Sequence, residues 1–361
     1  MIDYSVGRTA LNDGMVWCGL SGSGLEFSFI GDSIDVTIVG DSVSQNQYDV
    51  NNHARVAIYL DGERVVDDMI DETEKTYTVF EDSQAQMHTI KIVKLSEALS
   101  STFAIKEVGI GGREMYNIDA LSHIKTLSEL NQKDTIIEFI GDSITCGYGV
   151  DDPVKENGFS TKTEDVTKTY AYKTAEALGC GYSMVSYSGY GVISGYTSGE
   201  KASAMTVPQY YNKLGFSNVA KLNGQKLSDV EWTPTENQKP DIVVINLGTN
   251  DYNYTKSDSA KNEEFKQGYI DFLTQIREAN PEAMIICTCG IMGGDLYPVI
   301  EQAVAEFNDA NVYSMEFDVQ NINTDGVCAD WHPSEATHTK ASEKLVSFIQ
   351  KNFVKNNIVI S

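Results

Sequence analysis

Hydrophobic and polar residues follow two different patterns along the chain. In residues 1–110 they alternate, as in LEFSFI (25–30) and IDVTIV (34–39). Alternation with period two predicts strands that bury one face, and Asp61-Gly62 predicts a hairpin turn. We therefore expect an antiparallel β-sandwich of jelly-roll type, with no helix before about residue 119.

From about residue 134 the strands become continuous apolar runs, which are typical of strands buried on both faces of a parallel sheet. Segments with helical spacing of apolar residues lie between these runs. Strands that alternate with helices predict a three-layer α/β/α domain with a five-stranded parallel sheet. The expected strands are 135–140, 182–187, 241–247, 283–289 and 311–317, and the expected helices are 167–178, 265–276, 298–307 and 339–352. We expect domains at 1–115 and 130–361, with a linker near 111–133.

Composition narrows the class of protein. The chain has 361 residues, 41% of them hydrophobic, and 27 basic against 52 acidic residues, which gives a formal net charge of −25. Such a charge disfavours nucleic acid and anionic membranes as partners. The sequence contains no membrane-spanning run and no secretory signal, so we expect a cytoplasmic protein, or a secreted one if a signal has been removed. A homo-oligomer is compatible with the sequence.

Polar residues that can carry out acyl transfer follow the predicted parallel strands. Because the carboxyl ends of parallel strands share one edge of the sheet, these residues should meet there. Ser143 is the candidate nucleophile, and His332 is the candidate general base, which Asp330 could orient. The backbone N–H groups of Ser143 and Gly189 and the side-chain amide of Asn250 are candidates for the oxyanion hole. The six cysteines show no zinc-ligand spacing, so we expect free thiols and no zinc site. We also expect no cofactor.

The hexapeptide FIGDSI occurs twice, at 29–34 and at 139–144. The second copy ends a predicted buried parallel strand, which favours Ser143 as the nucleophile. The first copy lies between two alternating runs, so we expect Gly31-Asp32-Ser33 to form an ordinary turn in the sandwich.

These motifs carry a resemblance to a known superfamily. GDS at 141–143, Gly189, GTND at 248–251 and DWHP at 330–333 resemble blocks I, II, III and V of the SGNH (GDSL) hydrolases, in the same order. The whole chain resembles the acetyl xylan esterases of carbohydrate esterase family two. In the N-terminal half this resemblance lies at Gly7-Arg8, 22–38 and 88–97. It implies a metal-independent serine esterase that removes O-acetyl groups from xylan or related plant cell-wall polysaccharides and oligosaccharides.

One position departs from the superfamily pattern. The acid of the triad usually stands three residues before the histidine, but that position holds Ala329 here, and the carboxylate is at Asp330. A carboxylate two residues away can point elsewhere. Either Asp330 or a backbone carbonyl therefore orients His332.

Aromatic residues near these motifs are candidates for stacking on sugar rings. Trp331 lies between Asp330 and His332, and two further aromatic candidates flank the oxyanion residues, while the loop after the fourth strand could wall the cleft. The candidate substrate-binding residues are Trp331, Tyr190, Tyr252, Met292 and Tyr297.

Two other functions remain open from the sequence. The chain could be an SGNH esterase for another acyl group, such as a lysophospholipid or a thioester. It could also be a carbohydrate-binding protein without activity, although every catalytic position is filled.

Overall fold

The chain divides into two compact units, which we call unit 1 and unit 2. Unit 1 comprises Met1–Lys133, Ser160–Glu164 and Lys213–Gln238, and unit 2 comprises Asp134–Phe159, Asp165–Asn212 and Lys239–Ser361. The computed structural model describes residues 4–46, 48–111, 115–117, 133–219, 221–222, 225–355 and 358–359. Most of the expected linker at 111–133 lies outside the described residues. Segments 160–164 and 213–238 belong to the first unit although they follow residue 130 in the sequence.

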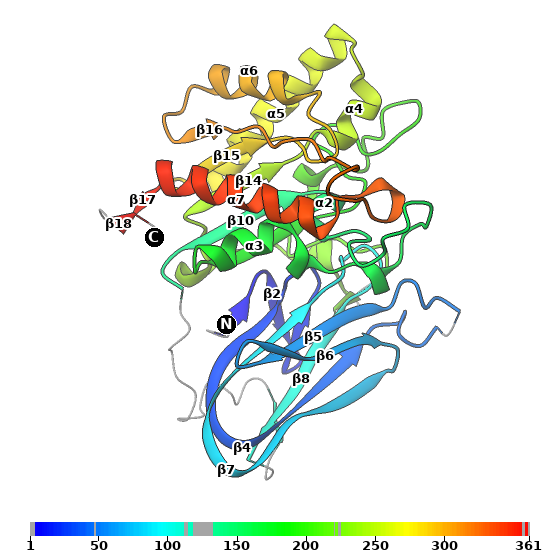
Figure 1. Cartoon of the computed structure of the whole chain (residues 1–361), viewed down its shortest axis with the longest axis vertical. Coiled ribbons are helices and arrows are strands. Elements are labelled where there is room, and N and C mark those ends of the chain that lie inside the picture. The colour runs from blue at the N-terminus through cyan, green and yellow to red at the C-terminus, as the bar shows by residue number, and fades with distance from the viewer. Residues whose placement is uncertain are drawn as a thin grey trace. The chain divides into compact units, whose positions relative to one another are not determined.

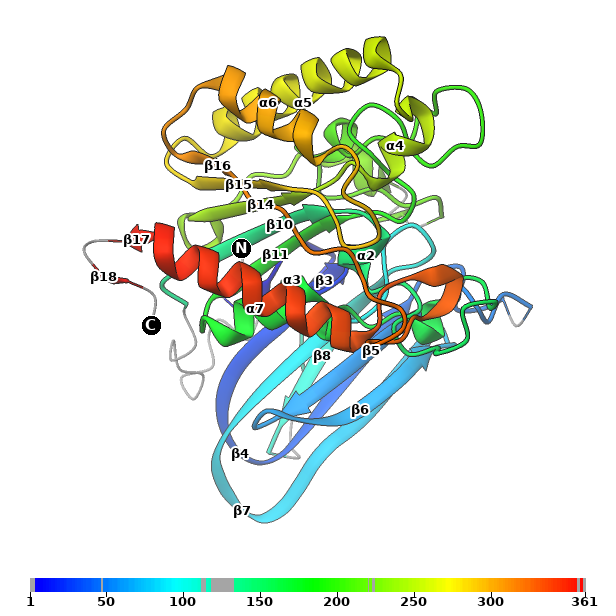
Figure 2. The same cartoon turned by 45° about the horizontal axis from the view of Figure 1, so that its top comes forward.

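Unit 1 is an antiparallel β-structure, as its alternating sequence predicts. In its described residues, nine strands form one sheet with the order β2-β3-β8-β4-β7-β5-β6, in which β1 pairs with β4 and β9 with β8. The two longest strands, β4 and β7, run side by side and curve together (Figure 2). Their inward residues, among them Phe27, Val36 and Ile92, are fully buried in the core. The strands are β1 (Ser5–Val6), β2 (Thr9–Asn12), β3 (Met15–Cys18), β4 (Gly24–Gly40), β5 (Ala54–Leu60), β6 (Glu63–Ile70), β7 (Glu74–Lys94), β8 (Phe103–Ile110) and β9 (Met115–Asn117), with a short pair, β12 (Lys221–Leu222) and β13 (Gln225–Lys226).

The predicted hairpin at Asp61-Gly62 is confirmed. It joins β5 to β6, and both residues have positive φ, 51° for Asp61 and 89° for Gly62. Two successive positive φ values match a two-residue turn whose twist suits the flanking strands, and glycine adopts them without strain.

The predicted turn at Gly31-Asp32-Ser33 is wrong, because β4 continues through these residues without reversing. The inward residues of β4 are odd-numbered up to Phe29 and even-numbered from Ile34, and both of these side chains are fully buried. Since side chains alternate along a strand, an inward face can change parity only if the pairing slips. The pairing of β4 with β7 shifts between Gly31 and Ser33. The first Gly-Asp-Ser is therefore part of a β-bulge.

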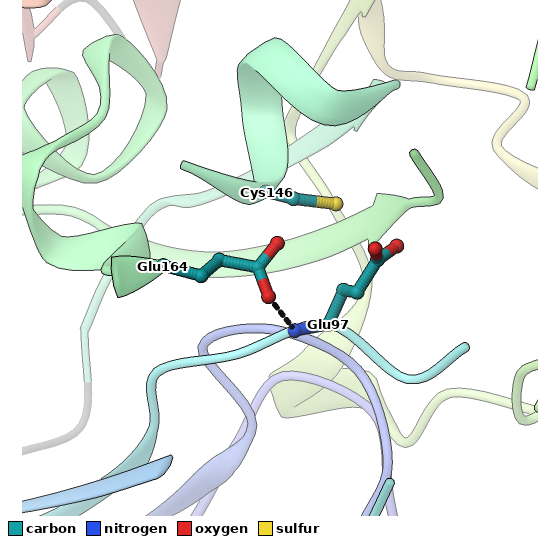
Figure 3. Close-up of side chains that lie close together, drawn as sticks. All are labelled: Glu97, Cys146 and Glu164. Carbon is teal, nitrogen blue, oxygen red and sulfur yellow. Dashed lines mark hydrogen bonds between the residues drawn. The ribbon is translucent and has the colours of Figure 1, made fainter. Parts of the chain in front are cut away.

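Segment 160–164 is held in unit 1 by hydrogen bonds to the sheet and its loops. The N–H of Thr161 donates to the carbonyl of Asn51 at 2.8 Å. The N–H of Glu97 donates to the Glu164 carboxylate at 2.8 Å (Figure 3). Burial raises the pKa of Glu164 well above its usual value. Cys146, which is also drawn in Figure 3, belongs to unit 2.

Unit 2 contains the predicted parallel sheet between two layers of helices. Its order is β11-β10-β14-β15-β16, and the neighbouring strands are parallel throughout the described residues. Helices α3 and α7 cover one face, and α5 and α6 cover the other (Figure 1). The strands are β10 (Ile136–Gly141), β11 (Gly181–Ser186), β14 (Ile242–Asn246), β15 (Met284–Thr288) and β16 (Val312–Ser314), with a short pair, β17 (Val354–Lys355) and β18 (Ile358–Val359). The α-helices are α2 (Ser143–Cys146), α3 (Tyr170–Ala177), α4 (Thr249–Thr255), α5 (Ser259–Ala279), α6 (Tyr297–Phe307) and α7 (Glu335–Asn352).

Short 3-10 turns complete the described elements of both units. They are η1 (Thr161–Thr163), η2 (Val166–Lys168), η3 (Val207–Tyr210), η4 (Leu227–Asp229), η5 (Glu236–Gln238) and η6 (Ala329–Trp331). All six cysteines are buried and free, as predicted. Within the described residues, no helix is long and apolar enough to cross a membrane.

His338 on α7 has a structural role in unit 2. It is buried, and its Nδ1 accepts a hydrogen bond of 3.1 Å from the N–H of Tyr170, the first residue of α3. A helix leaves its first N–H groups without partners inside the helix, so the imidazole caps α3. Burial lowers the pKa of His338 to about 3.

We expect the buried His338 to make stability depend on pH. Below about pH 6.5 the unfolded imidazole binds a proton that the folded one refuses until about pH 3, so the free energy of unfolding falls as pH decreases. The fall is about 1.4 kcal/mol per pH unit. A His338→Gln variant keeps an acceptor for Tyr170 but cannot titrate. Between pH 7 and pH 5, wild type should lose about 2 kcal/mol more than the variant in urea denaturation, and equal losses would contradict this account.

Candidate active site

Ser143 lies where strand β10 ends and the one-turn helix α2 begins. Asp142 caps this helix, and its carboxylate accepts a hydrogen bond of 3.0 Å from the N–H of Ile144. A side chain at Gly141 would collide with Thr145, because its Cβ would lie 2.0 Å from the threonine Oγ1. Glycine is therefore required for the sharp passage from strand to helix, which leaves Ser143 at the carboxyl edge of the sheet.

His332 reaches Ser143 from the loop that precedes α7. Its Nε2 is 2.9 Å from Ser143 Oγ, and its Nδ1 is 3.1 Å from the carbonyl oxygen of Ala329. A carbonyl can only accept a hydrogen bond, so Nδ1 carries the proton and Nε2 accepts from the serine hydroxyl. The imidazole therefore has the tautomer that a general base needs.

Burial also favours the neutral imidazole. It lowers the pKa of His332 to about 4, while the hydrogen bond to Ala329 and the charge of Asp330 oppose this effect. At neutral pH the ring is uncharged and ready to take the proton of Ser143.

Asp330 does not occupy the position of a triad acid in this structure. Its carboxylate accepts a hydrogen bond from the hydroxyl of Tyr148, while Nδ1 of His332 faces Ala329. The backbone explains this geometry, since residues 329–331 form the turn η6, which brings the carbonyl of Ala329 to the ring three residues later. Of the two alternatives that the sequence leaves open, the geometry therefore favours the backbone carbonyl.

The oxyanion candidates lie on the loops after β11 and β14. Gly189 has φ of 79°, and Asn250 lies buried in the first turn of α4. The side-chain amide of Asn250 donates to the carbonyl of Tyr190 at 2.9 Å and to the carboxylate of Asp142 at 3.1 Å. Asn250 is thus held next to Asp142, the residue before Ser143. An oxyanion bound by the Asn250 amide would either share its N–H groups with these two acceptors or replace one of them.

Asp251 links α4, which follows β14, to the loop that follows β11. Its carboxylate accepts hydrogen bonds of 2.8 to 3.1 Å from the N–H groups of Val192, Ile193 and Ser194. Burial raises its pKa to about 6. Asp251 therefore has a structural role, since it fixes the loop that follows Gly189.

The five predicted substrate-binding residues have different surroundings. Trp331 is 47% exposed, and the ammonium group of Lys155 lies 4.1 Å from the centre of its ring. Tyr190 is only 5% exposed, so its ring is not available for stacking on a sugar. Tyr252 on α4, Met292 after β15 and Tyr297 at the start of α6 are half-buried.

Two aromatic residues near the site were missed by the sequence analysis. Tyr196 is 64% exposed, and its N–H donates to the carbonyl of Gly189 at 2.7 Å, so an exposed ring lies beside the oxyanion candidate. The ring of Tyr148 stacks on the imidazole of His332. Tyr196 lies outside the four motifs, but Tyr148 stands only five residues after Ser143, where its proximity was a usable signal.

Comparison with known families agrees with this fold. Residues 139–340 match the GDSL-like Lipase/Acylhydrolase family, and residues 5–117 match the family Carbohydrate esterase 2 N-terminal. The chain therefore belongs to the GDSL-like lipase/acylhydrolase family, which confirms the superfamily inferred from its motifs. Within that family it combines the hydrolase fold with the N-terminal domain found in carbohydrate esterase family two.

Two curated relatives cover different shares of the chain. Cellulase/esterase CelE of Acetivibrio thermocellus is 30% identical over 341 residues, which is 92% of this chain and 37% of that protein. An acetylxylan esterase / glucomannan deacetylase of Cellvibrio japonicus is 27% identical over 228 residues, 60% of this chain and 59% of that protein. The chain thus spans less than two thirds of the length of either relative.

Solved structures share the fold over nearly the whole chain. A family two carbohydrate esterase from Clostridium thermocellum in complex with cellohexaose has a TM-score of 0.78 and 26% identity, and the match covers 96% of this chain and 98% of that one. An acetyl xylan esterase from the rumen bacterium Butyrivibrio proteoclasticus has a TM-score of 0.80 and 23% identity, with coverage of 97% and 95%.

The pKa of His332 predicts the acid limb of activity. Because the imidazole must be neutral to act as a base, kcat/KM should fall tenfold per pH unit below about pH 4 and not near 6.5. Hydrolysis of p-nitrophenyl acetate measured from pH 3 to pH 8 tests this expectation. Asp142→Asn is the control, since burial raises the pKa of Asp142 to about 7. If kcat/KM instead fell below about pH 6.5, and still did so in Asp142→Asn, the assignment of the acid limb to a His332 with a lowered pKa would be contradicted.

Proposed function

We propose that this chain is a serine esterase that removes O-acetyl groups from acetylated xylan or related plant cell-wall polysaccharides and oligosaccharides. The observation that carries the proposal is the contact of 2.9 Å between His332 Nε2 and Ser143 Oγ, with Nδ1 held by a carbonyl. A serine hydroxyl that donates to a buried neutral imidazole is an activated nucleophile.

The reaction follows from these contacts. Ser143 Oγ attacks the ester carbonyl as His332 Nε2 takes its proton, and the N–H groups of Ser143 and Gly189 with the Asn250 amide bind the oxyanion. His332 then protonates the departing sugar oxygen, which leaves an acetyl group on Ser143. Water attacks this ester with His332 as base, and the products are acetate and free enzyme. Each oxyanion donor contributes about 3 to 4 kcal/mol to the transition state.

Three observations support a carbohydrate as the substrate. The N-terminal residues match a family of carbohydrate esterases, and both curated relatives carry carbohydrate-active names. The exposed rings of Trp331 and Tyr196 can cover the apolar face of a sugar. The net charge of −25 favours a neutral polymer over an anionic lipid. An esterase for another acyl group remains the alternative that the assay below separates.

Replacing the nucleophile tests the mechanism. In Ser143→Ala, kcat/KM for acetate release from acetylated xylan should fall by roughly 10⁴-fold or more, with the fold retained. Ser33→Ala is the matched control, because Ser33 occupies the equivalent position in the first copy of the hexapeptide, which lies in unit 1. Unchanged release from Ser143→Ala would contradict the mechanism. Faster hydrolysis of long-chain than of acetyl esters by wild type would contradict the substrate.

Trp331 tests the sugar contact separately. Trp331 has φ of 65°, a conformation that asparagine tolerates, so Trp331→Asn keeps the loop. We expect its KM for xylan to rise about tenfold, equivalent to about 1.4 kcal/mol of binding, with kcat preserved. Hydrolysis of p-nitrophenyl acetate should stay near the wild-type rate. A matching loss on both substrates would instead assign Trp331 to the positioning of His332.

A further inference from the structure

Tyr148 connects the nucleophile's helix to the catalytic imidazole. The N–H groups of Gly147 and Tyr148 both donate to the carbonyl of Ser143 at 3.1 Å, so the backbone of Tyr148 is fixed relative to the nucleophile. Its ring lies flat on that of His332, with ring centres 3.9 Å apart and planes inclined by 17°. The ring of Phe159 packs against it at 5.1 Å.

Asp330 meets the other end of the same side chain. The Tyr148 hydroxyl donates a hydrogen bond to the Asp330 carboxylate. Asp330 is held in a left-handed conformation, with φ of 48°, and its N–H donates to the carbonyl of Asn157 at 3.0 Å. Aspartate tolerates the left-handed conformation better than most residues with a side chain, and its hydrogen bonds with Asn157 and Tyr148 hold it there.

We propose that Tyr148 and Asp330 form a positioning pair, in which the phenol ring holds the face of the His332 imidazole and conveys the influence of the carboxylate to it. This inference rests on the proposed esterase function and explains how His332 is supported when no carboxylate meets its Nδ1. In this proposal Tyr148 acts through His332 and not on the reacting ester.

The geometry explains why a stacked ring is needed. The hydrogen bonds to Ala329 and Ser143 lie near the plane of the imidazole, so they restrict its tilt out of that plane only weakly. A flat ring packed on one face restricts this tilt directly. It thereby keeps Nε2 aimed at the hydroxyl, and small losses of alignment can slow a reaction greatly.

The pair also favours the charge that develops during the reaction. When His332 takes the proton of Ser143 it becomes a cation, and the face of an aromatic ring attracts a cation within about 6 Å. A phenol that donates to a carboxylate has a more electron-rich ring, and the carboxylate's own charge favours the cation further. Among the described residues, His338 on α7 is a further titratable group close enough to His332 to feel its charge. Burial lowers the pKa of His338 to about 3, so His338 stays uncharged at neutral pH.

Three variants and one double variant test the pair with p-nitrophenyl acetate. Tyr148→Leu removes the aromatic face but keeps apolar bulk, and it should lower kcat roughly 10- to 100-fold with KM little changed. Tyr148→Phe and Asp330→Asn should each lower kcat by roughly 3- to 10-fold. Their combination should lose no more than the larger single loss, because both remove the same link. Tyr313→Phe, on the edge strand β16, is the control.

A titration separates this inference from the proposed function. In a Ser143→Ala background, which needs no activity, the His332 resonance followed by NMR should titrate at a lower pH in Tyr148→Leu and in Asp330→Asn. The chain has 5 histidines, so the signals can be assigned by substitution. A wild type without esterase activity but with these shifts would overturn the function and leave the pairing intact.

Other outcomes overturn the pair itself. If the fold-losses in kcat of Tyr148→Phe and Asp330→Asn multiply in the double variant, Asp330 and Tyr148 act independently. Wild-type kcat and an unmoved His332 titration in Tyr148→Leu would mean that the ring only fills space. If Tyr148→Leu does not fold, the cycle of Tyr148→Phe and Asp330→Asn decides, because Phe keeps the ring packing.

Discussion

The hydrogen bond from His332 Nδ1 to the carbonyl of Ala329 is the constraint on which the rest of the site depends. A carbonyl has no proton to give, so this contact alone selects the tautomer in which Nε2 can receive the proton of Ser143. A backbone group cannot change its charge, however, and it supplies only a dipole to the imidazolium. Asp330 stands one residue away from Ala329, and its carboxylate accepts a hydrogen bond from Tyr148, whose ring stacks on the imidazole. In the proposed positioning pair, this carboxylate supplies the negative charge that the carbonyl lacks.

The parallel sheet makes these short contacts possible between residues far apart in sequence. β10 is flanked by β11 and β14 in parallel register, so Ser143, the loop after Ser186 and the loop after Asn246 begin at one edge. The buried Asp251 carboxylate accepts the N–H groups of residues 192–194, and the buried Asp142 carboxylate accepts the side-chain amide of Asn250. Burial raises the pKa of both carboxylates.

The sequence predicts the parts of the site that depend on topology and misses those that depend on side-chain direction. The position of Ser143 was predictable because it directly follows a buried strand, whereas His332 lies well after β16 ends at Ser314 and was predictable from its motif, DWHP at 330–333. The burial of Tyr190 and the stacking of Tyr148 were not, since both are set by rotation of a side chain within a loop. Asp330 lies between these cases, because its position in the sequence is clear while the turn at 329–331 decides what it faces.

The two copies of FIGDSI show the same distinction in the backbone. After Phe139 the chain leaves the sheet at Gly141 and enters α2, whereas after Phe29 it bulges and continues as β4. The change of the inward residues from odd to even numbers across the first copy is compatible with a two-residue turn as well as with a bulge, so the sequence could not separate the two, and only the pairing of β4 with β7 identifies the bulge. An identical hexapeptide therefore exposes a serine to reaction only where the residues that follow stop the strand.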